Sequence, residues 1–330
     1  MRVRICFKTA FLFLLIISLS ACSGIRPIKG DKSDLNIVAK IGDVPVYLEE
    51  VKYLAENYKQ DMEKKYGEGI WDNADTAEKY RAELEENILG GMKKSASFVS
   101  LAKKYGVDID DKETEKYVNE YINSQFDDKA VYIEQLEENG ITDHHWRYLI
   151  AIESSKEELR QVLCREGVLD DSDEKARSVI ESDAFIRTLN VYIGNDEGED
   201  IEANRAKAEE ALRKLEEGEK LPRVIGRYSD YDGTTTTDGH YFMRGEHEKA
   251  YEEAAFALDE NEYSDVVEGE NGFYIIARLP KDAEYIEKNF ETLKAQYLYV
   301  EFNELLSNEA EQAELEFTEY GKTLDLAATR

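Results

Sequence analysis

The hydrophobic pattern of this chain changes its period twice, and this restricts the folds that it can adopt. From Glu49 to Val162 apolar residues recur every three or four positions, which is the spacing of one helix face. From Phe185 apolar and polar residues alternate, as on a half-buried strand. After Pro280 the helical spacing returns. The sequence therefore predicts an α+β fold in which a sheet-containing unit is inserted between two helical segments.

The helical segments also carry signals for where their helices begin and end. The clearest apolar stripe has spacings of four and three: Leu84, Ile88, Met92, Ala96 and Val99. Gly106 is expected to end that helix, and Asp110 or Asp111 to cap the next. Thr142 or Asp143 is expected to start a further helix. Only four prolines occur in 330 residues, which favours long helices.

Short strands are predicted at three places. Ile37 to Tyr47 reads as a small hairpin with a Gly-Asp turn. A second hairpin is expected to turn at Asn271-Gly272 and to end the inserted unit. The stretch from Leu315 to Leu326 is a possible last strand.

Charge and cysteine content exclude several classes of function. The chain has 72 acidic and 42 basic residues, a net charge of −30, and so lacks the cationic surface that nucleic acids require. Of its three cysteines, Cys6 lies within the N-terminal targeting segment described below, and Cys22 directly follows that segment. Cys164 is left without a partner, so neither a disulfide nor a cysteine zinc site is predicted. We expect no metal and no cofactor.

The N-terminus reads as a targeting segment. Three basic residues open the chain: Arg2, Arg4 and Lys8. The apolar run from Thr9 to Leu19 is too short for a bilayer span of about 20 residues and fits a signal peptide over residues 1–21. The following Leu19-Ser20-Ala21-Cys22 resembles a bacterial lipobox, which predicts lipidation of Cys22. The alternative is an ordinary secretory signal with a chance cysteine.

Adjacent histidines at 144 and 145 open a helix in the N-terminal segment. Adjacent helical positions point about 100° apart, so His144 and His145 cannot bind one metal ion from the same face. We expect both to be solvated.

The inserted unit resembles the parvulin-type peptidyl-prolyl isomerases. The resemblance is carried in order by YSD at 228–230, FMRG at 242–245, AFAL at 255–258 and GFYIIAR at 272–278. The flanking VAKIGDVPVYLEEV at 38–51 resembles the opening of SurA and PrsA chaperone domains. With the lipobox, the chain is most similar to the PrsA-type foldase lipoproteins.

The resemblance implies a division of the chain and a small mixed sheet with flanking helices in the inserted unit. The expected segments are a signal peptide (1–21), a flexible stalk (22–34), an N-terminal helical chaperone segment (35–180), a parvulin-like domain (183–280) and a C-terminal helical segment that packs with the N-terminal one (281–330).

The resemblance also assigns site residues. Phe242, His247 and Tyr251 fall at positions of the proline-binding pocket, and His247 replaces a usual apolar residue. Asn190 and Tyr274 stand where the family has two histidines. Tyr231 stands at the family's Cys or Asp position. The scaffold is thus expected to be present, with its catalytic polar residues replaced.

Prolyl isomerisation needs no covalent step, only rotation over a barrier of about 18–20 kcal/mol. Asn190 and Tyr274 are expected on neighbouring strands, where they either orient a peptide carbonyl or only satisfy one another. Neither titrates near neutral pH, so any pH dependence is expected to come from His247 alone. Ordinary activity and weak or lost activity both remain open.

Together these features predict a foldase held by lipid at the extracytoplasmic face of a bacterial cell membrane. Its partners would be unfolded or newly secreted proteins. The alternative is a non-catalytic lipoprotein that uses the parvulin scaffold to bind one folded partner or a cell-wall component.

Overall fold

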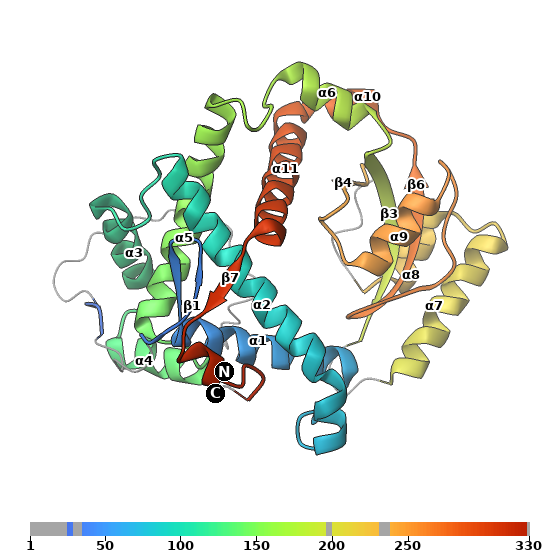
Figure 1. Ribbon diagram of the computed structural model, residues 1–330. Coiled ribbons are helices and arrows are strands. Elements are labelled where there is room, and N and C mark those ends of the chain that lie inside the picture. Colours follow the sequence, from blue (N-terminus) through green and yellow to red (C-terminus); the bar gives the residue numbers. More distant parts are fainter. Residues whose placement is uncertain (1–24, 29–34, 196–199, 231–237, 329–330) are drawn as a thin grey trace.

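The computed structural model describes residues 25–28, 35–195, 200–230 and 238–328. It shows a helical lobe and a smaller sheet-containing unit, with a long C-terminal helix between them (Figure 1). This confirms the predicted α+β class. The predicted signal peptide over 1–21, Cys22 and Tyr231 lie outside the described residues.

The helical lobe follows the apolar stripes of the sequence. Its helices are α1 (Leu48–Tyr66), α2 (Ala74–Lys104), α3 (Lys112–Gln125), α4 (Lys129–Glu138), α5 (Asp143–Arg165) and α6 (Asp173–Glu181). Leu84, Ile88 and Met92 of α2 are fully buried. Asp111 caps α3 through the Thr114 N–H, and Thr142 caps α5 through the His145 N–H, as two of the expected residues.

A three-stranded sheet joins the two ends of the described chain. It consists of β1 (Ile37–Ile41), β2 (Val44–Tyr47) and β7 (Leu315–Phe317) in the order β2-β1-β7. The hairpin predicted over 37–47 is confirmed, and β7 pairs antiparallel with β1. The possible strand over 315–326 is shorter than expected, because a 3-10 turn forms at Gly321–Thr323.

The C-terminal helical region consists of α10 (Ala283–Lys288) and α11 (Phe290–Gln312). Phe302 and Leu306 of α11 are buried in one cluster with Phe98 and Leu101 of α2. The other half of α11 packs against α6 and the sheet-containing unit. This helix is therefore part of both bodies of the molecule.

The inserted unit contains a four-stranded sheet with three helices. Its elements are β3 (Phe185–Gly194), α7 (Ile201–Glu216), α8 (Leu221–Tyr228), β4 (His240–Met243), α9 (Lys249–Ala257), β5 (Val267–Gly269) and β6 (Gly272–Leu279). The strand order is β4-β3-β6-β5, and every described pairing is antiparallel. The prediction of a mixed sheet is therefore wrong: β5 and β6 form a hairpin, and central β3 runs against both of its neighbours.

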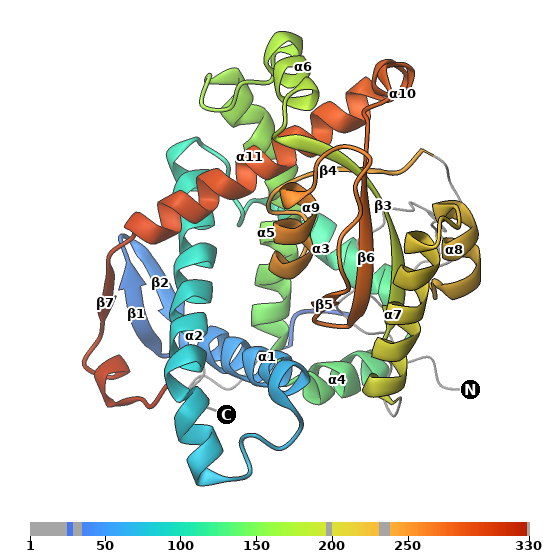
Figure 2. The same cartoon turned by 90° about the vertical axis from the view of Figure 1, so that its right-hand side faces the viewer.

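Each face of this sheet is covered by a different set of helices (Figure 2). Val191 and Ile275 lie on the face packed against α7 and α8. Ile186, Phe242 and Ile276 lie on the other face, under α9. The alternation of residues along β3 therefore decides which side chains reach the α9 face.

Residues 25–28 do not form the flexible stalk that the sequence predicts for 22–34. Ile25 is buried, and its N–H donates to Asn123 Oδ1 at 2.7 Å. The Ile28 N–H donates to Asp143 Oδ2 at 2.8 Å. This short stretch is instead held on α3 and α5. Within the described residues, no helix has the length and apolar character needed to cross a bilayer.

Candidate functional site

The register of the two central strands sets the polar residues of the candidate site. Asn190 of β3 is opposite Ile276 of β6, and Tyr192 is opposite Tyr274. Asn190 and Tyr274 therefore occupy diagonal positions on the face beneath α9. In an antiparallel sheet the Cα atoms of such a diagonal pair are about 7–8 Å apart.

The three residues expected to bind the proline ring lie together. The ring of His247 lies edge-on to Phe242, with centroids 4.5 Å apart, and 4.8 Å from the ring of Tyr251. Phe242 and Tyr251 are 5.7 Å apart. Phe242 is fully buried and Tyr251 is only 4% exposed, whereas His247 is exposed. The first two thus form an apolar floor, and His247 lies over it.

The hydroxyl of Tyr251 is the partner of Asn190. It donates to Asn190 Oδ1 at 3.4 Å and lies 3.0 Å from Thr188 Oγ1, which is itself fully buried. Burial raises the pKa of Tyr251 to about 12, so the phenol stays protonated. The hydroxyl of Tyr251 therefore contacts two polar residues of β3 on this face, Thr188 and Asn190.

Tyr274 is engaged elsewhere. Its pKa is raised by burial and then by the negative charge of the nearby Glu248 carboxylate. Its ring also packs 4.9 Å from Tyr192 and edge-on to Tyr251 at 5.2 Å. Gly269 makes room for this arrangement, since a Cβ there would lie 2.3 Å from Glu248 Oε1 and 2.6 Å from Tyr274 Cε2.

A buried carboxylate holds the loop that carries His247. Glu252 of α9 is 8% exposed, and its Oε1 accepts the N–H groups of Gly245, Glu246 and His247 at 2.7, 2.9 and 3.0 Å. Three donors on one oxygen fix the backbone of the loop before α9. The position of His247 over Phe242 follows from this contact.

A second histidine, which the prediction of pH dependence through His247 alone did not include, lies at the site. His240 of β4 lies 4.9 Å from His247 and stacks 5.7 Å from Phe242. Burial lowers the pKa of His240, and burial together with the neighbouring His240 lowers the pKa of His247. Two imidazoles, both mainly neutral at pH 7, therefore border the floor.

Sequence reasoning missed Thr188, Glu248 and Glu252 as supports of this site. Thr188 carried a detectable signal, because it shares the alternation of Asn190 and so faces α9. The two glutamates carried none, since their role depends on how the loop before α9 folds back.

The arrangement offers an apolar floor with a side-chain amide at its edge. In the structure this floor is covered by His247, and the side chain of Asn190 lies beside it. Across the described ranges, no group of three or more His, Cys, Asp or Glu side chains is placed to hold a metal ion.

Comparison with known proteins identifies both parts of the chain. The family model of a SurA-like N-terminal domain matches residues 2–160, and that of a PPIC-type peptidyl-prolyl isomerase domain matches residues 189–279.

Two curated relatives show how far the similarity extends. The foldase protein PrsA of Caldanaerobacter subterraneus is 25% identical over 281 residues, covering 84% of this chain and 82% of that protein. The foldase protein PrsA of Staphylococcus aureus is 26% identical over 184 residues, covering 53% of this chain and 54% of its own length. The chain thus spans most of the first relative and about half of the second.

Solved structures of the same kind are also similar. The foldase protein PrsA from Streptococcus pneumoniae matches 83% of this chain and 92% of its own, with 20% identity and a TM-score of 0.38. PrsA from Bacillus subtilis matches 84% and 91%, with 22% identity and a TM-score of 0.28. The chain therefore combines a match to a SurA-like N-terminal domain with a match to a PPIC-type peptidyl-prolyl isomerase domain, and over most of its length it is similar to foldase proteins of the PrsA type.

Proposed function

We propose that this protein is a lipid-anchored foldase that binds unfolded or newly secreted polypeptides at the extracytoplasmic face of a bacterial cell membrane. The observation that carries the proposal is the floor of Phe242 and Tyr251, bordered by His247 and by the side-chain amide of Asn190. A floor of this kind accepts an apolar ring of a chain in extended form and gives its backbone a hydrogen-bonding partner.

The chain divides, in this proposal, into the segments that the resemblance implies. The parvulin-like domain spans 183–280, and segments 35–180 and 281–330 form one chaperone body. Pairing of β1 with β7 and burial of Phe302 beside Phe98 support the joining of the two outer segments. The anchor is Cys22, following a signal peptide over 1–21.

Within the site, we assign the amide-orienting role to Asn190. Tyr274 packs against Tyr192 and Tyr251 and lies beside the carboxylate of Glu248, so we do not assign it the role of donor to the substrate. Isomerisation requires only that the twisted peptide amide be stabilised. A side-chain amide beside an apolar floor can do this by hydrogen-bonding to it. We expect turnover of X–Pro bonds to be slow, because one donor replaces the two histidines of the family pattern.

A pair of assays on the full chain tests this proposal. One follows isomerisation of a panel of X–Pro peptides, and the other follows aggregation of a denatured client diluted from urea. Asn190→Ala should abolish the slow isomerisation and leave the suppression of aggregation intact. Asn308→Ala, at an exposed position of α11, is the matched control and should change neither.

Failure to delay aggregation of any client would overturn the foldase assignment. Stable binding of one folded partner without any effect on unfolded chains would support the alternative, a non-catalytic interaction lipoprotein.

The anchor has its own test. Cys22→Ser removes the thiol to which a diacylglyceryl group is attached, so the variant should incorporate no labelled lipid and leave the membrane fraction. A variant that still partitions entirely with membranes would contradict the lipobox assignment.

A further inference from the structure

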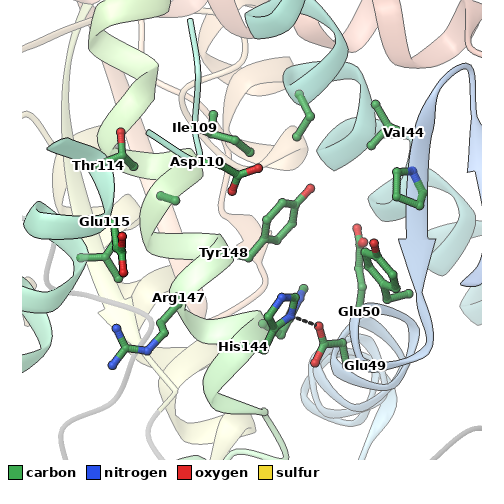
Figure 3. A pocket seen from close by; sticks show the side chains of 16 residues that line it. Val44, Glu49, Glu50, Ile109, Asp110, Thr114, Glu115, His144, Arg147 and Tyr148 are labelled. Carbon is green, nitrogen blue, oxygen red and sulfur yellow. Dashed lines mark hydrogen bonds and ion pairs between the residues drawn. The ribbon is translucent and has the colours of Figure 1, made fainter. Parts of the chain in front are cut away.

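A cavity with apolar walls and several charged side chains lies in the helical lobe, away from the parvulin-like unit. It measures about 420 Å³, within the range of small-ligand sites. It is formed where β2, α1, α3 and α5 meet, and Figure 3 shows its side chains. Its apolar walls are contributed by Val44, Pro45, Val99, Ile109, Val118 and Ala151.

Two lining residues, Glu50 and His145, each have a buried side-chain atom without a hydrogen-bond partner among the described residues. Glu50 is 4% exposed, and its Oε1 makes no hydrogen bond within the described residues. His145 is 2% exposed, and its Nε2 is likewise unpaired in that part of the chain. This also overturns the expectation of a solvated His145. Leaving a buried polar atom unpaired costs about 1–3 kcal/mol, so both atoms indicate a site for a ligand.

The neighbouring carboxylate, Glu49, has a partner for each of its two oxygens. Glu49 accepts from Thr142 Oγ1 with one oxygen and pairs with His144 Nδ1 through the other. Glu50 is therefore the acidic group that is available to a ligand. In Figure 3 it lies on α1, across the cavity from Tyr148 of α5.

The charges around the cavity favour a cation. Its acidic lining residues are Glu49, Glu50, Asp110 and Glu115, of which Asp110 and Glu115 are exposed. The one arginine of the lining, Arg147, is held by Asp143 at 3.0 Å and by Asn119 at 2.8 Å. Its guanidinium points away from α1 (Figure 3). The excess of carboxylates attracts positive charge and repels anions.

His145 can take part as a neutral acceptor. Burial lowers its pKa to about 3, with a further contribution from His144, so the imidazole carries no charge near pH 7. A neutral imidazole has one acceptor nitrogen, which lets Nε2 accept an N–H from a bound cation. The described residues offer no cluster of three or more ligating side chains, which disfavours a metal ion as the occupant.

We propose that this cavity binds an organic cation on an alkyl stem, with the charged group at Glu50 and His145 and the stem against the apolar walls. In a foldase this would be a lysine or arginine side chain of an unfolded client, so the inference rests on the proposed function. The same chemistry occurs in a free alkylamine, and the experiment separates these two sources.

Calorimetry at pH 8, where Glu50 is mostly ionised, with the full chain in a neutral detergent tests the proposal. The probes are a nine-residue unstructured peptide with one central lysine, the same peptide with arginine, norleucine or glutamate at that position, and n-butylammonium. Norleucine keeps the stem and lacks the charge. We expect the lysine and arginine peptides to bind about tenfold or more tightly than the norleucine peptide, and the glutamate peptide not to bind.

The variant Glu50→Gln keeps the shape of the side chain and removes its charge. It should abolish the preference for lysine over norleucine, whereas Glu86→Gln, at an exposed position of α2, should leave it unchanged. Binding of n-butylammonium with an affinity equal to that of the lysine peptide would show that the cavity serves free amines and would overturn the client assignment.

Equal binding of lysine and norleucine peptides by the unaltered protein would overturn the cation site itself. The aggregation assay is read on the same preparations. If clients are still protected from aggregation, the foldase proposal stands and only the inference about this cavity fails.

Discussion

Glu50 makes the stability of the helical lobe depend on pH, and Glu50→Gln measures how strongly. Burial, and secondarily the neighbouring Glu49, raises the pKa of Glu50 from 4.5 to about 7, against the opposing influence of the nearby Ser95 hydroxyl. Between pH 4.5 and about pH 7, the folded protein therefore keeps a proton on Glu50 that the unfolded chain has already released.

The sign and the size of the effect follow from this difference. The folded state binds the proton more tightly, so stability falls as the pH rises from about 4.5 to about 7, and the loss is complete above that range. Since one pKa unit corresponds to about 1.4 kcal/mol, the full loss is roughly 3 kcal/mol. Glutamine does not ionise and avoids this cost.

Urea unfolding from pH 4.5 to 8 is the appropriate assay, because urea does not screen charges. The chain has two tryptophans, Trp71 and Trp146, and both lie in the helical lobe, so their fluorescence reports on that lobe. We expect Glu50→Gln to be more stable than the parent at pH 8 by up to roughly 3 kcal/mol, and nearly equal to it at pH 4.5.

Glu86→Gln serves as the control for the general effect of removing one negative charge from an acidic protein. A stability difference between Glu50→Gln and the parent that is the same at pH 4.5 and pH 8 would refute the reasoning, since it would mean that Glu50 ionises as readily in the folded lobe as in water.

Three further predictions concern the parvulin-like unit. Tyr251→Phe leaves the buried hydroxyl of Thr188 without its partner and should lower the free energy of unfolding by about 1–2 kcal/mol, measured by circular dichroism in urea. In the His247→Met variant, peptide binding should still depend on pH between 5.5 and 8, because His240 still protonates beside the floor. Binding that does not change with pH in this variant would show that His240 does not affect peptide binding. The fragment 183–280 should fold alone, since its first and last strands pair with each other, and a disordered circular dichroism spectrum would contradict the proposed domain boundaries.

The long helices and their ends could be predicted because their causes are local. Leu84 and its four-residue repeats specify one buried face of α2, and the Thr142 side chain satisfies an N–H at the start of α5. Helix α8 was not predicted. It contains Pro222 and Gly226, which usually interrupt helices, but the proline stands in the first turn, where it is tolerated, and tertiary burial of Val224 supports the rest.

The site was only partly predictable, for a different reason. The family pattern places Phe242, His247 and Tyr251 in one cluster, and the structure brings them together. Which polar groups then pair is decided by register and by the loop before α9. These make Tyr251 the partner of Asn190, while Tyr274 packs against the rings of Tyr192 and Tyr251.

Helix α11 connects the two parts of the molecule through direct contacts. Gln296 donates to the Tyr241 carbonyl at 2.8 Å and to Glu246 Oε2, and Glu246 belongs to the loop that carries His247. Further along the same helix, Phe302 is buried in the core of the helical lobe. Since a helix is stiff over such a distance, a shift of this loop that keeps its hydrogen bonds must also move α11 against the helical lobe. The parvulin-like floor is therefore held by the chaperone body as well as by its own sheet, and this contact is absent from the isolated fragment.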